Sequence, residues 1–201
     1  MGFLSVLSCA HRLVEQRISP GDVAIDGTVG NGNDTVHLAK LVGPRGVVYG
    51  FDIQEQALES ARERLKRLLP EHPGVRLHLR SHADIGRVVA AEHRGRVAAA
   101  MFNLGYLPGS DQSTITRPES TMPALEAAIG LLRPGGIVTV VVYPGHDGGE
   151  NEAEAVERWA GNLPYDRYET LRYQFLNRPN KPPYLIAVEK RKTNKGMEGL
   201  P

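Results

Sequence analysis

Hydrophobic and polar positions along the chain follow two alternating periods. Short apolar runs, typical of buried strands, occupy residues 22–26, 47–52, 97–103 and 137–143, and apolar residues alternate with polar ones over a further strand at 75–79. Stretches with apolar residues at three- and four-residue spacing predict helices over residues 3–18, 34–42, 57–69, 85–92, 122–132 and 152–161. Two further strands are expected over residues 165–176 and 184–189. Strands that alternate with helices in this way favour an α/β protein with a parallel sheet.

The element order predicts a doubly wound, Rossmann-like α/β fold with a seven-stranded, mostly parallel sheet and helices on both faces. The last two strands form a hairpin-like antiparallel addition. We expect the helix over residues 3–18 to pack over the edge of the sheet, with His11 packed on or beside its apolar stripe rather than touching a ligand. The length of 201 residues suits one domain over residues 1–190, followed by a disordered tail over residues 191–201.

A glycine-rich turn connects the first strand to its helix. Its glycines let the backbone turn tightly and approach a ligand, and Asn33 or Asp34 can cap the helix. The first crossover of such a sheet is where nucleotide-like ligands bind. The candidate cofactor-binding residues of this stretch are Asp26, Gly27, Gly30, Asn31, Gly32, Asn33 and Asp34.

Acidic residues at the strand ends narrow the choice of cofactor. A dinucleotide would place its pyrophosphate against the glycine turn, where the Asp26 carboxylate would repel it. The same carboxylate favours a cationic ligand such as S-adenosylmethionine, which carries an ammonium and a sulfonium. Asp52 can accept from the ribose hydroxyls of either cofactor or cap the following turn. These charges favour a methyltransferase over its rival, an NAD-dependent oxidoreductase.

The fourth strand ends in Asn103-Leu-Gly-Tyr106, where methyltransferases that act on amino nitrogens carry (Asn/Asp)-Pro-Pro-Tyr. An asparagine carbonyl beside the donor methyl can accept from the attacking N–H and stabilise the charge growing on nitrogen. Tyr106 can stack on a base. Because Leu-Gly replaces Pro-Pro, the match is partial. His146, in a second glycine-rich loop, is a candidate proton acceptor or substrate contact.

Composition excludes several classes of function. With 24 basic and 23 acidic residues, the net charge of +1 rules out a strongly basic nucleic-acid binder, although it allows a local basic patch. Cys9 is the only cysteine, which excludes a disulfide framework and a thiol-based metal site and fits a reducing cytoplasm. No apolar run approaches the about 18 residues of a membrane span, so we expect no membrane segment.

These motifs resemble a family of small single-domain proteins long labelled "putative rRNA methylases" and later assigned as methyltransferases of the transfer-RNA wobble uridine. The family usually has alanine where Gly27 stands, a change expected to matter little. The resemblance rests on residues 26–35, 49–54, 81–82, 103–111, 114–116, 143–150 and 177–180.

The resemblance implies a class I methyltransferase fold with S-adenosylmethionine as cofactor. It implies direct SN2 transfer to the 5-aminomethyl group of wobble 2-thiouridine, giving the 5-methylaminomethyl product, without a metal. Asn103 would orient the amine, Tyr106 and the 108–116 loop would shape the pocket, and His146 would help to remove or share the proton.

Further site residues follow from the same resemblance and from their places at strand ends. Gln54, Ser81, His82 and Asp84 join the cofactor-binding set, with Asp84 either accepting from the adenine amine or capping a helix. Asp111 and Thr114 belong to the substrate loop. Candidate contacts to the anticodon backbone are Arg178, Asn180 and Lys181, which otherwise form an exposed polar loop. A homodimer would widen the limited basic face. A methyltransferase of ribosomal RNA or of a small amine, and a non-catalytic cofactor- or RNA-binding module, remain as alternatives.

Overall fold

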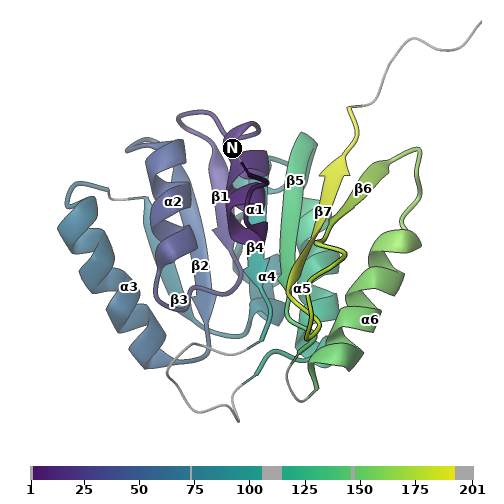
Figure 1. Cartoon of the computed structure of the whole chain (residues 1–201). Coiled ribbons are helices and arrows are strands. Elements are labelled where there is room, and N and C mark those ends of the chain that lie inside the picture. Colours follow the sequence, from purple (N-terminus) through teal and green to yellow (C-terminus); the bar gives the residue numbers. More distant parts are fainter. Residues whose placement is uncertain (1, 73, 106–114, 146–147, 193–201) are drawn as a thin grey trace, which may run out of the picture.

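The computed structural model describes residues 2–72, 74–105, 115–145 and 148–192. Strands and helices alternate along it (Figure 1). The strands are β1 (Val23–Asp26), β2 (Val47–Asp52), β3 (Val75–Leu79), β4 (Val97–Asn103), β5 (Leu132–Val142), β6 (Tyr168–Tyr173) and β7 (Tyr184–Lys190). The α-helices are α1 (Val6–Glu15), α2 (Asn33–Val42), α3 (Glu55–Leu68), α4 (Ile85–Val88), α5 (Pro118–Leu131) and α6 (Gly149–Gly161). Two short 3₁₀ turns, η1 (His82–Asp84) and η2 (Ala91–His93), flank α4.

The strands form one sheet in the order β3-β2-β1-β4-β5-β7-β6. Strands β1 to β5 run parallel, whereas β7 pairs antiparallel with both β5 and β6. The predicted seven-stranded, mostly parallel sheet with a terminal antiparallel pair is therefore confirmed. Because parallel strands end at the same edge, the residues after β1, β2, β4 and β5 meet there.

Helices cover both faces of the sheet: α1, α2 and α3 lie on one face, and α4, α5 and α6 on the other (Figure 1). The expected edge position of the first helix is wrong. Val6, Ala10 and Val14 of α1 are buried in a core cluster with Ile137 of β5 and Leu185 of β7. These three side chains fall on one helical stripe that needs an apolar surface, and the interior strands β5 and β7 provide it.

The turn between β1 and α2 differs from the predicted cap. Gly32 occupies the N-cap position with φ 73°, and no side chain caps the helix. Asn33 and Asp34 therefore lie inside α2 rather than before it. The positive φ explains a glycine at the N-cap, because other residues adopt it only with strain. Among the helices of the described segments, none is long and apolar enough to cross a membrane.

Candidate functional site

A cleft of about 910 Å³ opens at the edge where the parallel strands end. Its walls come from the glycine turn, the ends of β2, β4 and β5, the exposed side of α1, and residues 180–183. This is the position at which the sequence predicts cofactor binding, at the first crossover of the sheet. The volume falls in the usual range for small-molecule sites.

Asp52 ties the end of β2 to the glycine turn. Its Oδ2 accepts from the backbone N–H of Gly30 at 2.9 Å, and its Oδ1 accepts from that of Gln54 at 2.9 Å. The second contact is the turn-capping bond expected as an alternative role, yet Asp52 also lines the cleft. A carboxylate thus stands in the wall beside the turn, held by two backbone donors.

Asp26 lies beneath the turn and not in the cleft wall. The residue is fully buried, and its carboxylate accepts from the Thr28 N–H at 3.1 Å and from the Thr35 hydroxyl at 2.6 Å. Burial, reinforced by the nearby charge of Asp34, raises the pKa of Asp26 to about 7. Asp26 therefore joins the turn to α2, because its two oxygens accept hydrogen bonds from Thr28 of the turn and Thr35 of α2.

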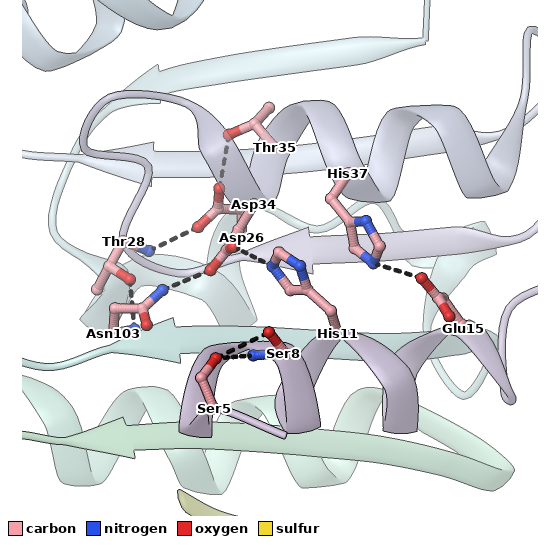
Figure 2. Close-up of polar contacts among 10 residues, drawn as sticks. All are labelled: Ser5, Ser8, His11, Glu15, Asp26, Thr28, Asp34, Thr35, His37 and Asn103. Carbon is pink, nitrogen blue, oxygen red and sulfur yellow. Dashed lines mark hydrogen bonds and ion pairs between the residues drawn. The ribbon is translucent and has the colours of Figure 1, made fainter. Parts of the chain in front are cut away.

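Asp34 is the acidic group of α2 that lines the cleft. Its Oδ1 accepts from His11 Nε2 at 2.6 Å, and its Oδ2 accepts from Asn103 Nδ2 (Figure 2). This pairing overturns the expectation that His11 only packs, since His11 also lines the cleft. The hydrogen bond to Asp34 raises the pKa of His11 despite its partial burial, which favours an imidazolium–carboxylate pair.

Asn103 stands at the end of β4 with its backbone and side chain both held. Its backbone N–H donates to the Thr28 hydroxyl at 2.7 Å, and its side-chain Nδ2 donates to Asp34 (Figure 2). The amide oxygen Oδ1 is buried and has no hydrogen-bond partner among the residues that the structure describes. Buried acceptors are seldom left without a donor, so this oxygen beside the cleft is the acceptor that a ligand would complete.

The wall beyond β3 contains Ser81 and His82, as predicted. His82 is buried, its Nε2 lies 3.2 Å from the Ser120 hydroxyl, and burial lowers its pKa. Asp84 does not line the cleft, and its carboxylate instead faces Arg87 at 3.5 Å and Arg80 at 4.0 Å. The alternative role of Asp84 as a helix cap is wrong, since its side chain makes no capping bond, whereas acceptance from the adenine amine stays a prediction.

The opposite rim is formed by residues 180–183. Asn180 and Lys181 have positive φ values of 62° and 46°, and Lys181 forms an ion pair with Glu150. Arg178 does not reach the cleft, because its guanidinium stacks over the Phe175 ring at 3.9 Å from the centroid. The predicted trio therefore divides into two rim residues and one neighbour.

A buried carboxylate braces the two ends of the long loop after β4. Glu152 of α6 accepts from the hydroxyls of Thr116 at 2.7 Å and Thr121 at 2.6 Å. Thr116 in turn accepts from the Gly105 N–H at 2.7 Å. The backbone N–H of Thr116 also donates to the Gly105 carbonyl. These bonds close the loop at its base and place Thr116 in the cleft wall.

The fold brings together most of the predicted site residues. Those lining the cleft are Gly27, Gly30, Asn31, Asn33, Asp34, Asp52, Gln54, Ser81, His82, Asn103, Asn180 and Lys181. Those that do not line it are Asp26, Gly32, Asp84 and Arg178. Tyr106, Asp111, Thr114 and His146 lie outside the described residues. Thr116 belongs to the 108–116 loop that was expected to shape the pocket, whereas sequence reasoning missed His11, Thr28 and Tyr143 as lining residues.

Gly32 shows why a glycine of the turn can stay away from the cleft. A Cβ at this position would lie 2.8 Å from the Ala61 Cα, so the glycine permits close packing of the turn on α3. No metal site emerges either: no group of three or more His, Cys, Asp or Glu side chains in the described segments could hold an ion.

The sequence of the chain is similar to those of known proteins. Residues 48–189 match the family described as "Putative rRNA methylase". An Arabidopsis thaliana protein named tRNA (mnm(5)s(2)U34)-methyltransferase, chloroplastic, is 42% identical over 189 residues, covering 90% of this chain and 68% of that protein.

Two solved structures share the fold along nearly their whole length. A structure titled as a putative rRNA-methylase from Clostridium thermocellum is 39% identical with a TM-score of 0.89, covering 94% of this chain and 100% of that one. A methyltransferase structure from Streptococcus mutans in complex with SAH is 37% identical with a TM-score of 0.84, covering 94% of this chain and 99% of that one. The predicted class I methyltransferase fold is confirmed, and the chain belongs to the family described as "Putative rRNA methylase".

Proposed function

We propose that the protein is an S-adenosylmethionine-dependent N-methyltransferase that acts on transfer RNA. Its substrate is the 5-aminomethyl group of wobble 2-thiouridine, and its product is the 5-methylaminomethyl nucleoside. The Arabidopsis relative, named for this modification at U34, supports the substrate. The Streptococcus structure, which was determined with SAH, supports the cofactor. The observation that carries the proposal is the amide oxygen of Asn103, a residue of the cleft wall, which has no hydrogen-bond partner in the described part of the chain.

The charge of the cleft supports a cationic methyl donor. Asp52 lines the wall beside the turn, whereas Asp34 is paired with His11 and Asp26 lies beneath the turn. A pyrophosphate placed on this turn would face the Asp52 carboxylate, whereas an ammonium and a sulfonium would be attracted to it. Electrostatics thus favours S-adenosylmethionine over NAD, although the acid that lines the wall from α2 is Asp34 rather than Asp26.

The proposed reaction needs no covalent enzyme intermediate. The neutral amine, having lost its extra proton, attacks the methyl carbon with its lone pair. The carbon–sulfur bond breaks, its electrons remain on sulfur, and the product is a secondary ammonium plus the thioether. The Asn103 oxygen, accepting one N–H, would aim the lone pair and stabilise the positive charge that grows on nitrogen.

Several residues enter this proposal as predictions from sequence alone. Tyr106 would stack on the base and His146 would take or share the amine proton. Asp111 and Thr114 would contact the substrate from the long loop. On the described rim, Lys181 and Asn180 are the candidates to meet the anticodon backbone. A homodimer that widens the basic face remains a prediction, and a transfer-RNA substrate fits the cytoplasm.

The test is transfer of a labelled methyl group from S-adenosylmethionine to undermodified transfer RNA, followed by mass spectrometry of the wobble nucleosides. We expect label on the aminomethyl nitrogen, and at least a hundredfold lower rate for Asn103→Ala, by analogy with loss of one transition-state hydrogen bond. Unlabelled wobble nucleoside would contradict the substrate assignment.

Parallel reactions separate the alternatives. Ribosomal RNA and small primary amines are offered in place of transfer RNA, and labelling of either one alone would favour that substrate. Calorimetry compares S-adenosylmethionine with NAD, and tighter NAD binding would favour an oxidoreductase. Full activity of Asn103→Ala would remove the catalytic role of this residue, whereas binding of S-adenosylmethionine without methyl transfer to any of the three substrates would favour a non-catalytic binding module.

A further inference from the structure

We infer that His11 and Asp34 act as a positioning pair that fixes the Asn103 side-chain amide in one orientation, with its oxygen free for the attacking amine. This inference rests on the proposed function and deepens it. It assigns a role to a helix, α1, that sequence analysis treats as packing alone. Figure 2 shows the three side chains converging from α1, α2 and β4.

The Asp34 carboxylate determines which end of the Asn103 side-chain amide, the nitrogen or the oxygen, faces it. An asparagine amide can be turned about, exchanging its N–H donors with its acceptor oxygen. An ionised carboxylate only accepts, so Asp34 Oδ2 can be satisfied only by the Asn103 Nδ2. The reversed amide would set oxygen against oxygen. The oxygen Oδ1 is therefore left as the free acceptor, in agreement with its lack of a partner within residues 2–72, 74–105, 115–145 and 148–192.

His11 keeps Asp34 in the form that this selection requires. Its Nε2 donates to the second carboxylate oxygen, Oδ1, at 2.6 Å. Asp34 is buried, and Asp26 lies close enough for the two charges to interact. An imidazolium offsets the cost of holding this carboxylate ionised beside another acid. A protonated Asp34 would present a hydroxyl and lose its strict preference for a donor.

The other groups facing His11 are consistent with this charge assignment. The imidazole of His37 stacks on it with centroids 4.0 Å apart, and Glu15 Oε1 lies 3.9 Å from His37 Nε2. Burial and the neighbouring His11 lower the pKa of His37. The two pKa shifts have opposite directions and favour His11 as the charged imidazole, and of these two histidines it is His11 that bonds to Asp34 (Figure 2).

The test compares variants that keep or remove the donor to Asp34. His11→Gln places an amide N–H near the position of Nε2, whereas His11→Leu fills the space without a donor, and Asp34→Asn removes the acceptor-only group. Single-turnover methyl transfer is measured with saturating donor and saturating transfer RNA. Because misplacement of a reacting group costs up to about a hundredfold, we expect His11→Leu and Asp34→Asn to be roughly 10- to 100-fold slower, and His11→Gln within about fivefold of wild type.

His37→Leu is the matched control, because it changes the stacked imidazole without touching the bonds to Asp34. Its rate is expected to stay within about threefold of wild type. Equal rates in His11→Leu and wild type would overturn the inference. So would a rate for His11→Gln as low as that of His11→Leu, since the packing of the ring and not its donor would then matter.

A second readout does not depend on turnover. The side-chain ¹⁵N amide signals of Asn103, assigned by their loss in Asn103→Asp, report the bond to Asp34. We expect these signals to shift in His11→Leu and Asp34→Asn and to stay near their wild-type positions in His37→Leu. If the wild-type enzyme labels no wobble nucleoside, the proposed function fails while these spectra still decide the inference. Signals that are identical in His11→Leu and wild type would overturn it.

Discussion

Gly27 lies where the turn after β1 passes directly against the ring of Phe102. A Cβ added at Gly27 would be 2.2 Å from the ring atom Cε1. The structure therefore corrects the expectation that alanine here changes little. Because Phe102 is buried, the ring can move only by disturbing its neighbours. We expect Gly27→Ala to lower the free energy of unfolding by about 1–3 kcal/mol, measured by urea denaturation.

Two further variants separate a local clash from a general effect of alanine. Gly130 in α5 has open space around it, so Gly130→Ala is expected to leave stability unchanged or to raise it by about 1 kcal/mol. The double variant Gly27→Ala/Phe102→Leu replaces the ring by a smaller side chain. It is expected to lower the free energy of unfolding by less than the sum of the two single changes. Strict additivity would show that the ring is not the obstacle.

At the residue scale, predictability depends on whether a role follows from a strand end. Asn103 and Asp52 could be predicted because each is the last residue of an apolar strand, and parallel strands end at one edge. His11 could not be predicted, because its partner Asp34 is 23 positions away. Asp26 was predicted to face the cofactor. In the structure the turn covers this residue, and both of its carboxylate oxygens accept hydrogen bonds from the protein.

At the scale of elements, one buried carboxylate links β1, the glycine turn and α2. Its folded pKa of about 7 lies above the about 3.9 expected in the unfolded chain. Between these two pKa values the folded state binds more protons than the unfolded state. The contribution of Asp26 protonation to the free energy of unfolding is therefore fully present below about pH 4 and is lost as pH rises through 7. Asp26→Asn, uncharged throughout, is expected to escape that loss.

We expect the unfolding free energy of Asp26→Asn, relative to wild type, to rise by roughly 2 kcal/mol between pH 5 and pH 8. Denaturant titrations of both proteins at each pH measure this difference, in which the titrations of other groups cancel. Asp166→Asn serves as the control, because Asp166 is exposed in the turn before β6. A pH-independent difference for Asp26→Asn would mean that Asp26 stays ionised in the folded protein.

The accuracy of element prediction follows the strength of the hydrophobic signal. Strands β2, β3 and β4 match their predicted ranges, since each is an uninterrupted pattern bounded by turn residues. Helix α5 begins at Pro118, four residues before its predicted start. A proline suits the first helical turn, but Pro118 and Pro123 together make the segment look like loop in sequence. What stabilises that first turn is the tertiary bond from Thr121 to Glu152.

At the scale of the whole molecule, topology was predictable because five alternations leave few ways to build a sheet. The sequence predicts the edge of the sheet at which the cleft lies but not its walls. These walls include residues of α1 and residues 180–183, which lie far apart in the sequence. Charge distribution is a property of the same scale. A net charge of +1 gives no strong overall attraction to RNA, so affinity for transfer RNA must come from cations placed at the cleft rim.

Salt dependence measures how many of these cations meet phosphate. Each neutralised phosphate contributes about 0.7–0.9 to the slope of log affinity against log salt. Lys181 is the candidate on the rim, so Lys181→Gln is expected to weaken transfer-RNA binding several-fold and to reduce the slope by about that amount. Arg45→Gln removes the same charge from the turn before β2, at the opposite edge of the sheet, and is expected to leave the slope unchanged. Filter-binding titrations from low to high salt compare the three proteins. Equal slopes in Lys181→Gln and wild type would remove Lys181 from the RNA interface, whereas equal losses in both variants would indicate that net charge alone governs binding.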